Sequence, residues 1–88
     1  MNSRIVIVKL FSGMNQRSAT IFADTAVKFK SVIRVKHNGV QANGKSFLGL
    51  LSRNVRVDDV IEIIADGPDE NEALDTLENL VKSNFQEY

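Results

Sequence analysis

Apolar side chains recur at steps of three and four in two long segments of this chain, so each segment presents one apolar stripe to be buried. The first segment runs from Gln16 to about Lys30 and the second from Asp69 to about Asn84. A helix with one apolar face needs a partner surface, which favours helices packed on one face of a sheet. The stripe residues are Ala19, Phe22, Ala23, Ala26 and Phe29 in the first helix, and Ala73, Leu74, Leu77, Leu80 and Val81 in the second.

Four short segments are expected to form that sheet. Arg4 to Leu10 contains a run of β-branched residues, which predicts a strand buried at least partly on both faces. Residues 32–35 and Val40 to Asn43 flank Asn38-Gly39, the strongest two-residue signal for a hairpin. The fourth segment is Val60 to Ala65.

A short helix from Ser46 to about Arg53, capped by its serine, completes the element order β-α-β-β-α-β-α. This order predicts an α+β fold with a four-stranded, mostly antiparallel sheet covered on one face by three helices. Asp69 with Glu72 three residues later predicts a capping box at the last helix. No repeat or linker divides the 88 residues, so we expect a single domain, 1–88.

Composition excludes several classes of protein. Eleven basic residues balance eleven acidic ones, so net charge does not favour nucleic acid or membrane as a partner. Without cysteine there is no disulfide framework and no thiolate site. Apolar runs are far shorter than a membrane span, and Met1 to Lys9 does not resemble a signal peptide. We therefore expect a cytoplasmic protein.

The titratable residues indicate no metal site and no cofactor. His37 is the only histidine, and we expect it to lie solvated at a strand end. Asp58 and Asp59 begin a strand without a partner base, and the acidic residues in 66–72 suit the start of a helix, not a calcium loop.

Two motifs in register carry a resemblance to a known family. Residues 13–20 resemble the segment of HPr phosphocarriers that reads glycine, an apolar residue, the phosphorylated histidine, alanine, arginine, proline and alanine. Residues 43–52 resemble the family's segment around its regulatory serine, and the 65–67 turn also agrees. In the first motif Gly13, Met14, Arg17 and Ala19 fit, whereas Asn15 stands at the histidine's position and Ser18 at the proline's.

The resemblance covers essentially the whole chain and implies the HPr-like open-faced β-sandwich. It is closest in type to the catabolite-repression HPr-like proteins (Crh), which also lack the histidine and keep the serine. An imidazole nitrogen accepts and releases a phosphoryl group, but the lone pair of a carboxamide nitrogen is delocalised into its carbonyl. Asn15 therefore predicts a protein that is not a phosphocarrier, while asparagine remains a good N-cap for the helix.

The resemblance also assigns roles around Ser46. It implies phosphorylation of Ser46 by an HPr-type serine kinase/phosphorylase, and binding of the product to a LacI-type catabolite control regulator or a metabolic enzyme. The implied contacts are Arg17, Phe47, Leu48 and Leu51. With the family, Arg17 is expected to bind a phosphate or carboxylate at the helix N-terminus. Without the family, Ser46 is explained as an N-cap, Arg17 as a solvated arginine, and the apolar residues as core.

The leading interpretation is a regulatory adaptor of the phosphotransferase and carbon catabolite repression system, not an enzyme. A degenerate phosphotransferase-system component or an unmodified binding domain is the alternative. Phosphotransfer through His37 is a weaker possibility, because the residue lies far along the chain from Arg17. A ferredoxin-like nucleic-acid-binding module is weaker still, because the predicted strands lack aromatic residues for base stacking.

Overall fold

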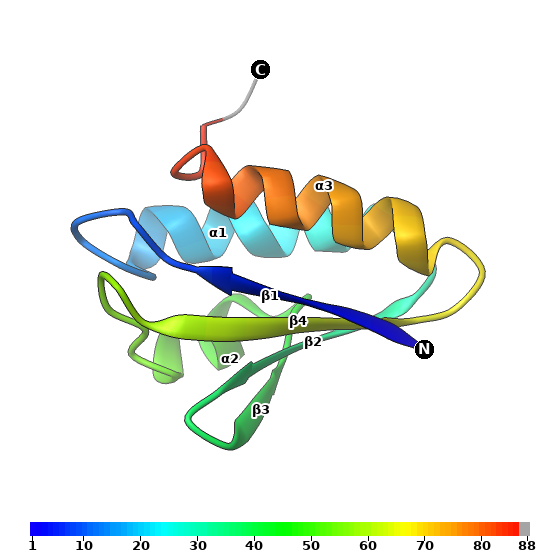
Figure 1. Ribbon diagram of the computed structural model, residues 1–88, viewed down its shortest axis with the longest axis horizontal. Coiled ribbons are helices and arrows are strands. Elements are labelled where there is room, and N and C mark those ends of the chain that lie inside the picture. Colours follow the sequence, from blue (N-terminus) through cyan, green and yellow to red (C-terminus); the bar gives the residue numbers. More distant parts are fainter. Residues whose placement is uncertain (87–88) are drawn as a thin grey trace.

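The computed structural model describes residues 1–86 and contains one four-stranded antiparallel sheet with three helices (Figure 1). The strands follow the order β1-β4-β2-β3 across the sheet. The predicted fold class and element order are confirmed. The elements are β1 (Asn2–Ile7), α1 (Gln16–Ala26), β2 (Val32–His37), β3 (Val40–Asn43), α2 (Phe47–Ser52), β4 (Val60–Asp66) and α3 (Glu70–Lys82).

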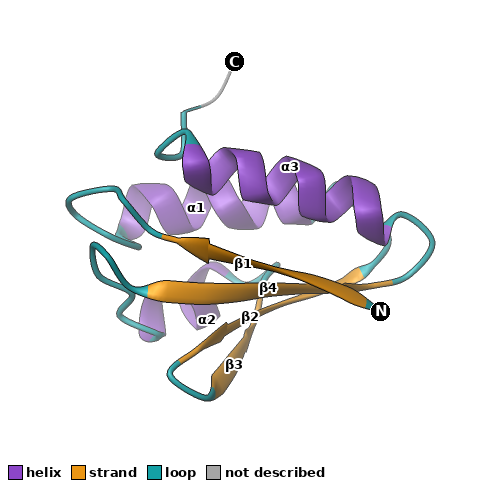
Figure 2. Cartoon of the chain, in the orientation of Figure 1, coloured by secondary structure: helices purple, strands orange, loops and turns teal. Residues whose placement is uncertain are grey.

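The core lies between the sheet and the helices. In Figure 2, α1 and α3 run side by side along one side of the sheet, and α2 is the shorter helix beside the β2–β3 hairpin. Side chains alternate along each strand, so one face of the sheet points into this core and the other is open. The fully buried side chains include Phe22 from α1, Ile33 and Val35 from β2, Leu50 from α2, Ile61 and Ile63 from β4, and Leu74 and Leu77 from α3.

The first strand differs from its prediction in both extent and burial. Ile5 is 69% exposed and Ile7 is 47% exposed, because both point to the open face of the sheet, which nothing covers in the described residues. Regular pairing also stops at Ile7, although Val8 still exchanges backbone hydrogen bonds with Asp58 and Asp59. The irregularity has a local cause, since Asp58 adopts a φ of 70° and breaks the ladder there.

The first helix ends four residues earlier than predicted. After Ala26 the backbone closes with two tighter bonds, from Lys28 N to Thr25 O and from Phe29 N to Ala26 O, both 3.2 Å. Such three-residue bonds satisfy the last carbonyl groups of a helix. The turn still directs Phe29 against the core, so the predicted stripe is correct although the helix is shorter.

The predicted capping box between Asp69 and Glu72 is wrong. Asp69 is the N-cap residue of α3, but its carboxylate makes no capping hydrogen bond. It accepts instead from the Lys30 N–H at 2.8 Å, from the Ser31 N–H at 2.9 Å and from the Ser31 hydroxyl. The carboxylate therefore joins the start of α3 to the segment before β2, a contact across 38 residues of sequence.

These hydrogen bonds to Asp69 make the stability of the fold sensitive to acid. The Ser31 hydroxyl, followed by the Lys30 N–H, lowers the pKa of Asp69 to about 2, from an ordinary value of 3.8. A lowered pKa in the folded state stabilises the protein above the unfolded pKa, and this contribution is lost as the pH falls through the folded value. We therefore expect the urea midpoint to fall between about pH 4 and about pH 2. An Asp69→Asn variant should show a shallower decline in that window, and an identical decline in both proteins would contradict this assignment.

His37 is buried, not solvated as predicted. It follows Ile33 and Val35 on the core-facing side of β2 and is only 4% exposed. Its Nε2 lies 2.8 Å from Oδ2 of Asp59, so Asp59 has a basic partner after all. The Arg56 N–H, and then His37, lower the pKa of Asp59. The pair ties the β2–β3 hairpin to the loop before β4, which is a structural role.

Candidate functional site

A tight loop presents the N-terminus of α1 and carries the first motif. Gly13 has a φ of 64°, a conformation that favours glycine. A Cβ at this position would lie 2.3 Å from the Val55 carbonyl oxygen. The next residue, Met14, is buried, and its N–H donates to the same oxygen at 2.9 Å. The loop is therefore fixed against residues 55–56, and this sets the position of Asn15.

Asn15 caps α1, as its residue type predicts. Its Oδ1 accepts from the Ser18 N–H at 2.9 Å, and Ser18 Oγ accepts from the Asn15 N–H at 2.8 Å. The two residues thus form a reciprocal capping box. The Asn15 Nδ2 group donates to Ser12 Oγ at 2.6 Å. Both ends of the carboxamide are engaged, which leaves no proton-accepting nitrogen at this position.

Ser18 has a role that the sequence analysis did not assign. Besides closing the capping box, its buried hydroxyl donates to the Gly13 carbonyl at 2.9 Å. The usual capping box has glutamate or glutamine at this helix position, so a serine there is a weak indication of one. The spacing of Asn15 and Ser18 was the available clue.

Removing the Ser18 hydroxyl should destabilise the fold. A Ser18→Ala substitution removes the buried hydroxyl that bonds both the Gly13 carbonyl and the Asn15 N–H, which then keep only the 3.1 Å hydrogen bond to each other. We expect a loss of about 2 kcal/mol in the free energy of unfolding. The exposed Ser12 hydroxyl serves as the matched control, since Ser12→Ala should cost less than about 0.5 kcal/mol. Urea titrations of both variants measure the difference, and equal losses would contradict this account.

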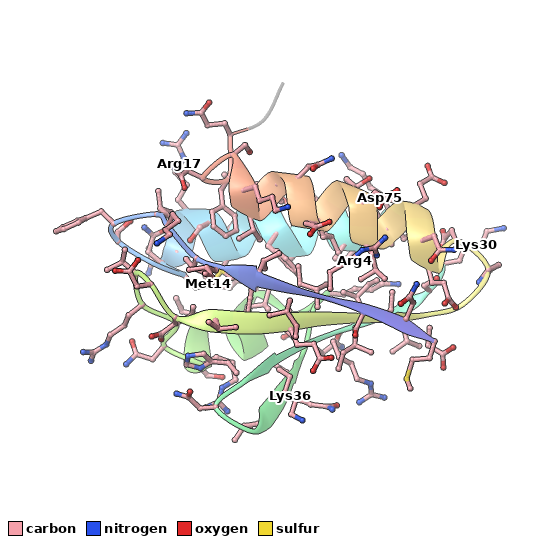
Figure 3. All side chains as sticks on the ribbon, in the orientation of Figure 1. Arg4, Met14, Arg17, Lys30, Lys36 and Asp75 are labelled. Atoms are coloured by element: carbon pink, nitrogen blue, oxygen red, sulfur yellow. The ribbon has the colours of Figure 1, made fainter. Side chains whose placement is uncertain are left out.

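Arg17 borders a hollow of about 350 Å³ at the start of α1. Its side chain is exposed, and within residues 1–86 it makes no hydrogen bond or ion pair. Figure 3 shows Arg17 beside the end of α3. The first N–H groups of α1 also lack intrahelical acceptors, so this end of the helix favours an anion. The hollow is lined by Leu10, Ser12, Asn15, Arg17, Ser18, Ile21, Asn84, Phe85 and Gln86.

The far wall of this hollow comes from residues after α3. Asn84 and Phe85 both adopt positive φ, 59° and 62°, and the Phe85 N–H donates to the Leu80 carbonyl at 2.8 Å. This turn buries the Phe85 ring in the core. The burial of Phe85 is not predicted from the sequence, although an asparagine just after a helix is a known signal for such a turn.

Ser46 is the N-cap of α2, as predicted. Its Oγ accepts from the Gly49 N–H at 3.0 Å, and the side chain is half-buried. The neighbouring Lys45 reaches across to the turn after α1 and donates from Nζ to the Phe29 carbonyl at 2.7 Å. Ser46 is thus held at the start of the helix, while its hydroxyl proton has no acceptor in the described residues.

The apolar side chains of α2 divide between core and surface. Leu50 is completely buried, whereas Phe47 and Leu51 are half-buried and pack against the edge of the core. Leu48 points outward and is 71% exposed. Of the three apolar contacts implied by the resemblance, Leu48 is therefore the one fully available to another molecule.

The structure does not join Arg17 directly to the Ser46 segment. Helices α1 and α2 pack together, but Arg17 faces the hollow next to residues 84–86. Phe11, in the loop before α1, is 91% exposed and is a further surface residue that is not predicted from the sequence. A lone aromatic in a polar loop gives no periodic pattern by which its exposure could be recognised.

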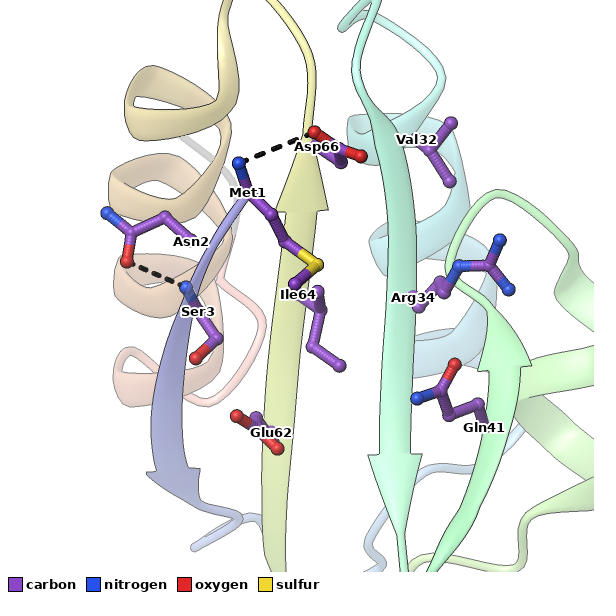
Figure 4. A pocket seen from close by; sticks show the side chains of 9 residues that line it. All are labelled: Met1, Asn2, Ser3, Val32, Arg34, Gln41, Glu62, Ile64 and Asp66. Atoms are coloured by element: carbon purple, nitrogen blue, oxygen red, sulfur yellow. Dashed lines mark hydrogen bonds and ion pairs between the residues drawn. The ribbon is translucent and has the colours of Figure 1, made fainter.

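The open face of the sheet carries a second hollow. A shallow hollow of about 520 Å³ lies on the open face of the sheet (Figure 4). Its lining includes Ser3, Arg34 and Glu62, and the N-terminus forms a 3.4 Å ion pair with Asp66 at its edge. Within residues 1–86, no three histidine, cysteine or acidic side chains are grouped to hold a metal ion. In the same range, no helix is long and apolar enough to cross a membrane.

Comparisons with known proteins agree with the motifs. The family model for the phosphorylation site of the phosphotransferase-system component HPr matches residues 2–83. Phosphocarrier protein HPr of Mycoplasma genitalium is 40% identical over 79 residues, which cover 89% of this chain and 90% of the relative.

Solved structures show the same architecture. A crystal structure of HPr from Thermoanaerobacter tengcongensis is 35% identical, has a TM-score of 0.94 and is matched over 100% of this chain and 99% of the other. The catabolite repression protein Crh of Bacillus subtilis, solved as a domain-swapped dimer, is 33% identical with a TM-score of 0.77, over 99% and 100% of the two chains. With two motifs, the fold and these relatives in agreement, this chain belongs to the HPr family.

Proposed function

We propose that this chain is a regulatory HPr-like protein that receives its signal on Ser46 and does not carry a phosphoryl group at position 15. The observation that carries the proposal is the carboxamide of Asn15 at the family's histidine position, with both of its ends hydrogen-bonded. A carboxamide nitrogen is not nucleophilic at neutral pH, so the carrier reaction lacks its acceptor. The similarity to Crh, a protein named for catabolite repression, supports the hypothesis of a regulatory role.

Two departures from the family motif support each other physically. The Asn15 cap depends on an N–H at position 18, which the family's proline does not have. The Ser18 hydroxyl then returns a bond to Asn15. Replacement of both residues converts a loop that exposes an imidazole into a closed capping box. This pairing is expected of a protein that has diverged away from phosphotransfer.

Ser46 is suited to act as the phosphorylated residue. Its Oγ only accepts, so a kinase can take the hydroxyl proton without breaking a described bond. A phosphate here adds about −1.5 to −2 charge units at a helix N-terminus, where dipole and N–H groups favour it. Modification is therefore compatible with the fold. The exposed Leu48 lies two positions along the same helix, so one partner could contact both groups.

The proposed partners are those that the family resemblance implies. We assign an HPr-type serine kinase/phosphorylase as the modifying enzyme, and a LacI-type catabolite control regulator or a metabolic enzyme as the receiver. An arginine on the receiver would pair with the phosphate, and an apolar pocket would accept Leu48 with the exposed edges of Phe47 and Leu51. Arg17 offers a separate anion-binding group at the start of α1, beside residues 84–86 and outside the Ser46 surface.

Incubation with an HPr-type serine kinase and ATP tests the proposal. The wild-type protein and a Ser52→Ala variant should each gain a phosphate, and Ser46→Ala should gain none. Ser52 is the matched control, because it is exposed on the same helix and donates to the Gly49 carbonyl at 2.8 Å. Loss of the Ser46 cap costs only about 1 kcal/mol, so the variant should remain folded. Undiminished labelling of Ser46→Ala would refute the assignment.

A further inference from the structure

Phe11 is the most exposed large apolar side chain in the described part of the chain. It lies at the second position of a tight turn, which the Gly13 N–H closes by donating to the Leu10 carbonyl at 2.9 Å. The turn is fixed on both sides, because Leu10 packs against the core and the Met14 N–H donates to the Val55 carbonyl. A ring held in this way loses little freedom on binding, which is typical of an aromatic anchor in an interface.

The hollow at the start of α1 lies directly beside this turn. Leu10 and Ser12, the residues on either side of Phe11, both line the hollow, whereas Phe11 does not. In Figure 1 the loop that carries the turn projects at one end of the molecule, between β1 and α1. Phe11 therefore stands outside a hollow of about 350 Å³, a volume that accepts a phenyl ring.

The lining of the hollow suits an aromatic ring. Ile21 and Phe85 form apolar parts of its wall, and both pack against the core. Arg17 borders it with an exposed guanidinium group, which makes no hydrogen bond or ion pair within residues 1–86. A planar guanidinium group stacks on the face of an aromatic ring. The polar groups of Asn15 and Ser18 are already hydrogen-bonded to each other, so covering them costs little.

We propose that two copies of this chain associate at this end of the molecule, with Phe11 of each copy seated in the hollow of the other and stacked on Arg17. Because ring and hollow lie side by side on each copy, one two-fold axis makes both contacts at once, and association stops at a dimer. The net charge of zero means that no long-range repulsion opposes the meeting of two identical chains. The contact exchanges no strand and does not depend on Ser46.

Sedimentation equilibrium of the full chain tests this contact. We expect a monomer–dimer equilibrium with a dissociation constant below about 1 mM, as for a small interface. A Phe11→Ser variant should raise this constant by about a hundredfold, because loss of an anchor costs at least about tenfold and the two-fold axis repeats the loss. Leu48→Ser is the matched control, since it removes another exposed apolar side chain and should associate like the wild-type protein.

Two further variants test the partners of the ring. Arg17→Lys keeps the charge but loses the planar group, so it should weaken the dimer by about tenfold. The chain has no tryptophan, so the emission of a Phe11→Trp variant reports on this position. Its emission should shift to the blue as the protein concentration rises from about 10 µM to about 1 mM, and dilution should reverse the shift.

Several results would overturn the proposal. A wild-type protein that stays monomeric at about 1 mM has no such contact. A dimer that Phe11→Ser leaves intact, or that Leu48→Ser weakens equally, is held by another surface. A dimer that dilution does not dissociate, or a Phe11→Trp dimer whose emission remains that of an exposed indole, would also contradict it. Because Phe11 is exposed, its replacement should leave the urea midpoint unchanged, which separates lost association from lost folding.

Discussion

An Asn15→His variant should accept a phosphoryl group from a phosphoenolpyruvate-driven phosphotransferase system under conditions that leave the wild-type protein unlabelled. The loop that positions residue 15 is held by Gly13 and Met14 against the Val55 carbonyl, and this arrangement does not depend on the Asn15 side chain. An imidazole placed there supplies the missing nucleophile, with Arg17 and the helix N-terminus nearby to stabilise the phosphate. The expected change is from no labelling to stoichiometric, acid-labile labelling.

Asn15→Gln is the matched control for that result. It keeps the carboxamide and adds one methylene, so it should remain unlabelled although the loop is equally perturbed. Acid treatment identifies the product, because phosphohistidine is hydrolysed and phosphoserine is not. Labelling of the wild-type protein at residue 15, or of Asn15→Gln, would contradict the account. A folded Asn15→His protein that stays unlabelled would show that the lost nucleophile is not what prevents phosphotransfer.

Gly13→Ala should be one of the most damaging single substitutions in the chain. For alanine, adopting the positive φ of 64° costs about 1–2 kcal/mol of free energy. Its Cβ would also lie 2.3 Å from the Val55 carbonyl oxygen and 2.9 Å from Cα of Arg56. Both contacts are with backbone, which does not rotate away, so we expect a total loss of about 3–4 kcal/mol in the free energy of unfolding.

Gly39→Ala separates the two causes. Gly39 also has a positive φ, 80°, but no atom lies within 4 Å of the added Cβ. This variant should lose only the conformational term, about 1–2 kcal/mol. Urea midpoints of the two variants provide the comparison, and equal losses would show that the contact with Val55 is not strained.

The sequence predicts the elements well where their pattern is periodic. The apolar stripes of α1 and α3 and the Asn38-Gly39 hairpin all lie where expected, because each is set by neighbours in sequence. Errors arise where the deciding contact comes from far along the chain. The spacing of Asp69 and Glu72 predicts a capping box, but the Asp69 carboxylate accepts from Ser31 instead.

His37 is a second residue whose position is decided by a contact from far along the chain. A single histidine before a turn is ordinarily solvated. In β2, however, alternate side chains face the core, and His37 lies on the same side as Ile33 and Val35. The buried imidazole is hydrogen-bonded by Asp59, which lies 22 residues away and for which the sequence predicts no partner. The pair cannot be predicted from either residue alone, because the folded sheet brings the two side chains together.

The candidate site was predictable in part. Asn15 and Ser46 are both N-caps, as their residue types and positions predict. The Ser18 return bond and the Phe85 turn were missed, because serine is an uncommon capping partner and the turn lies outside any helix. The division of α2, with Leu48 exposed and Leu50 buried, follows from helical geometry once the core is placed.

The central claim is that this protein takes its signal through Ser46 and not through residue 15. Its most direct test is the intact mass of the wild-type protein after exposure to both phosphoenolpyruvate-driven and ATP-dependent kinase systems, followed by brief acid treatment and mapping. The account predicts a single phosphate that survives acid and maps to Ser46. A phosphate that acid removes, or a protein left unmodified by both systems, would contradict it.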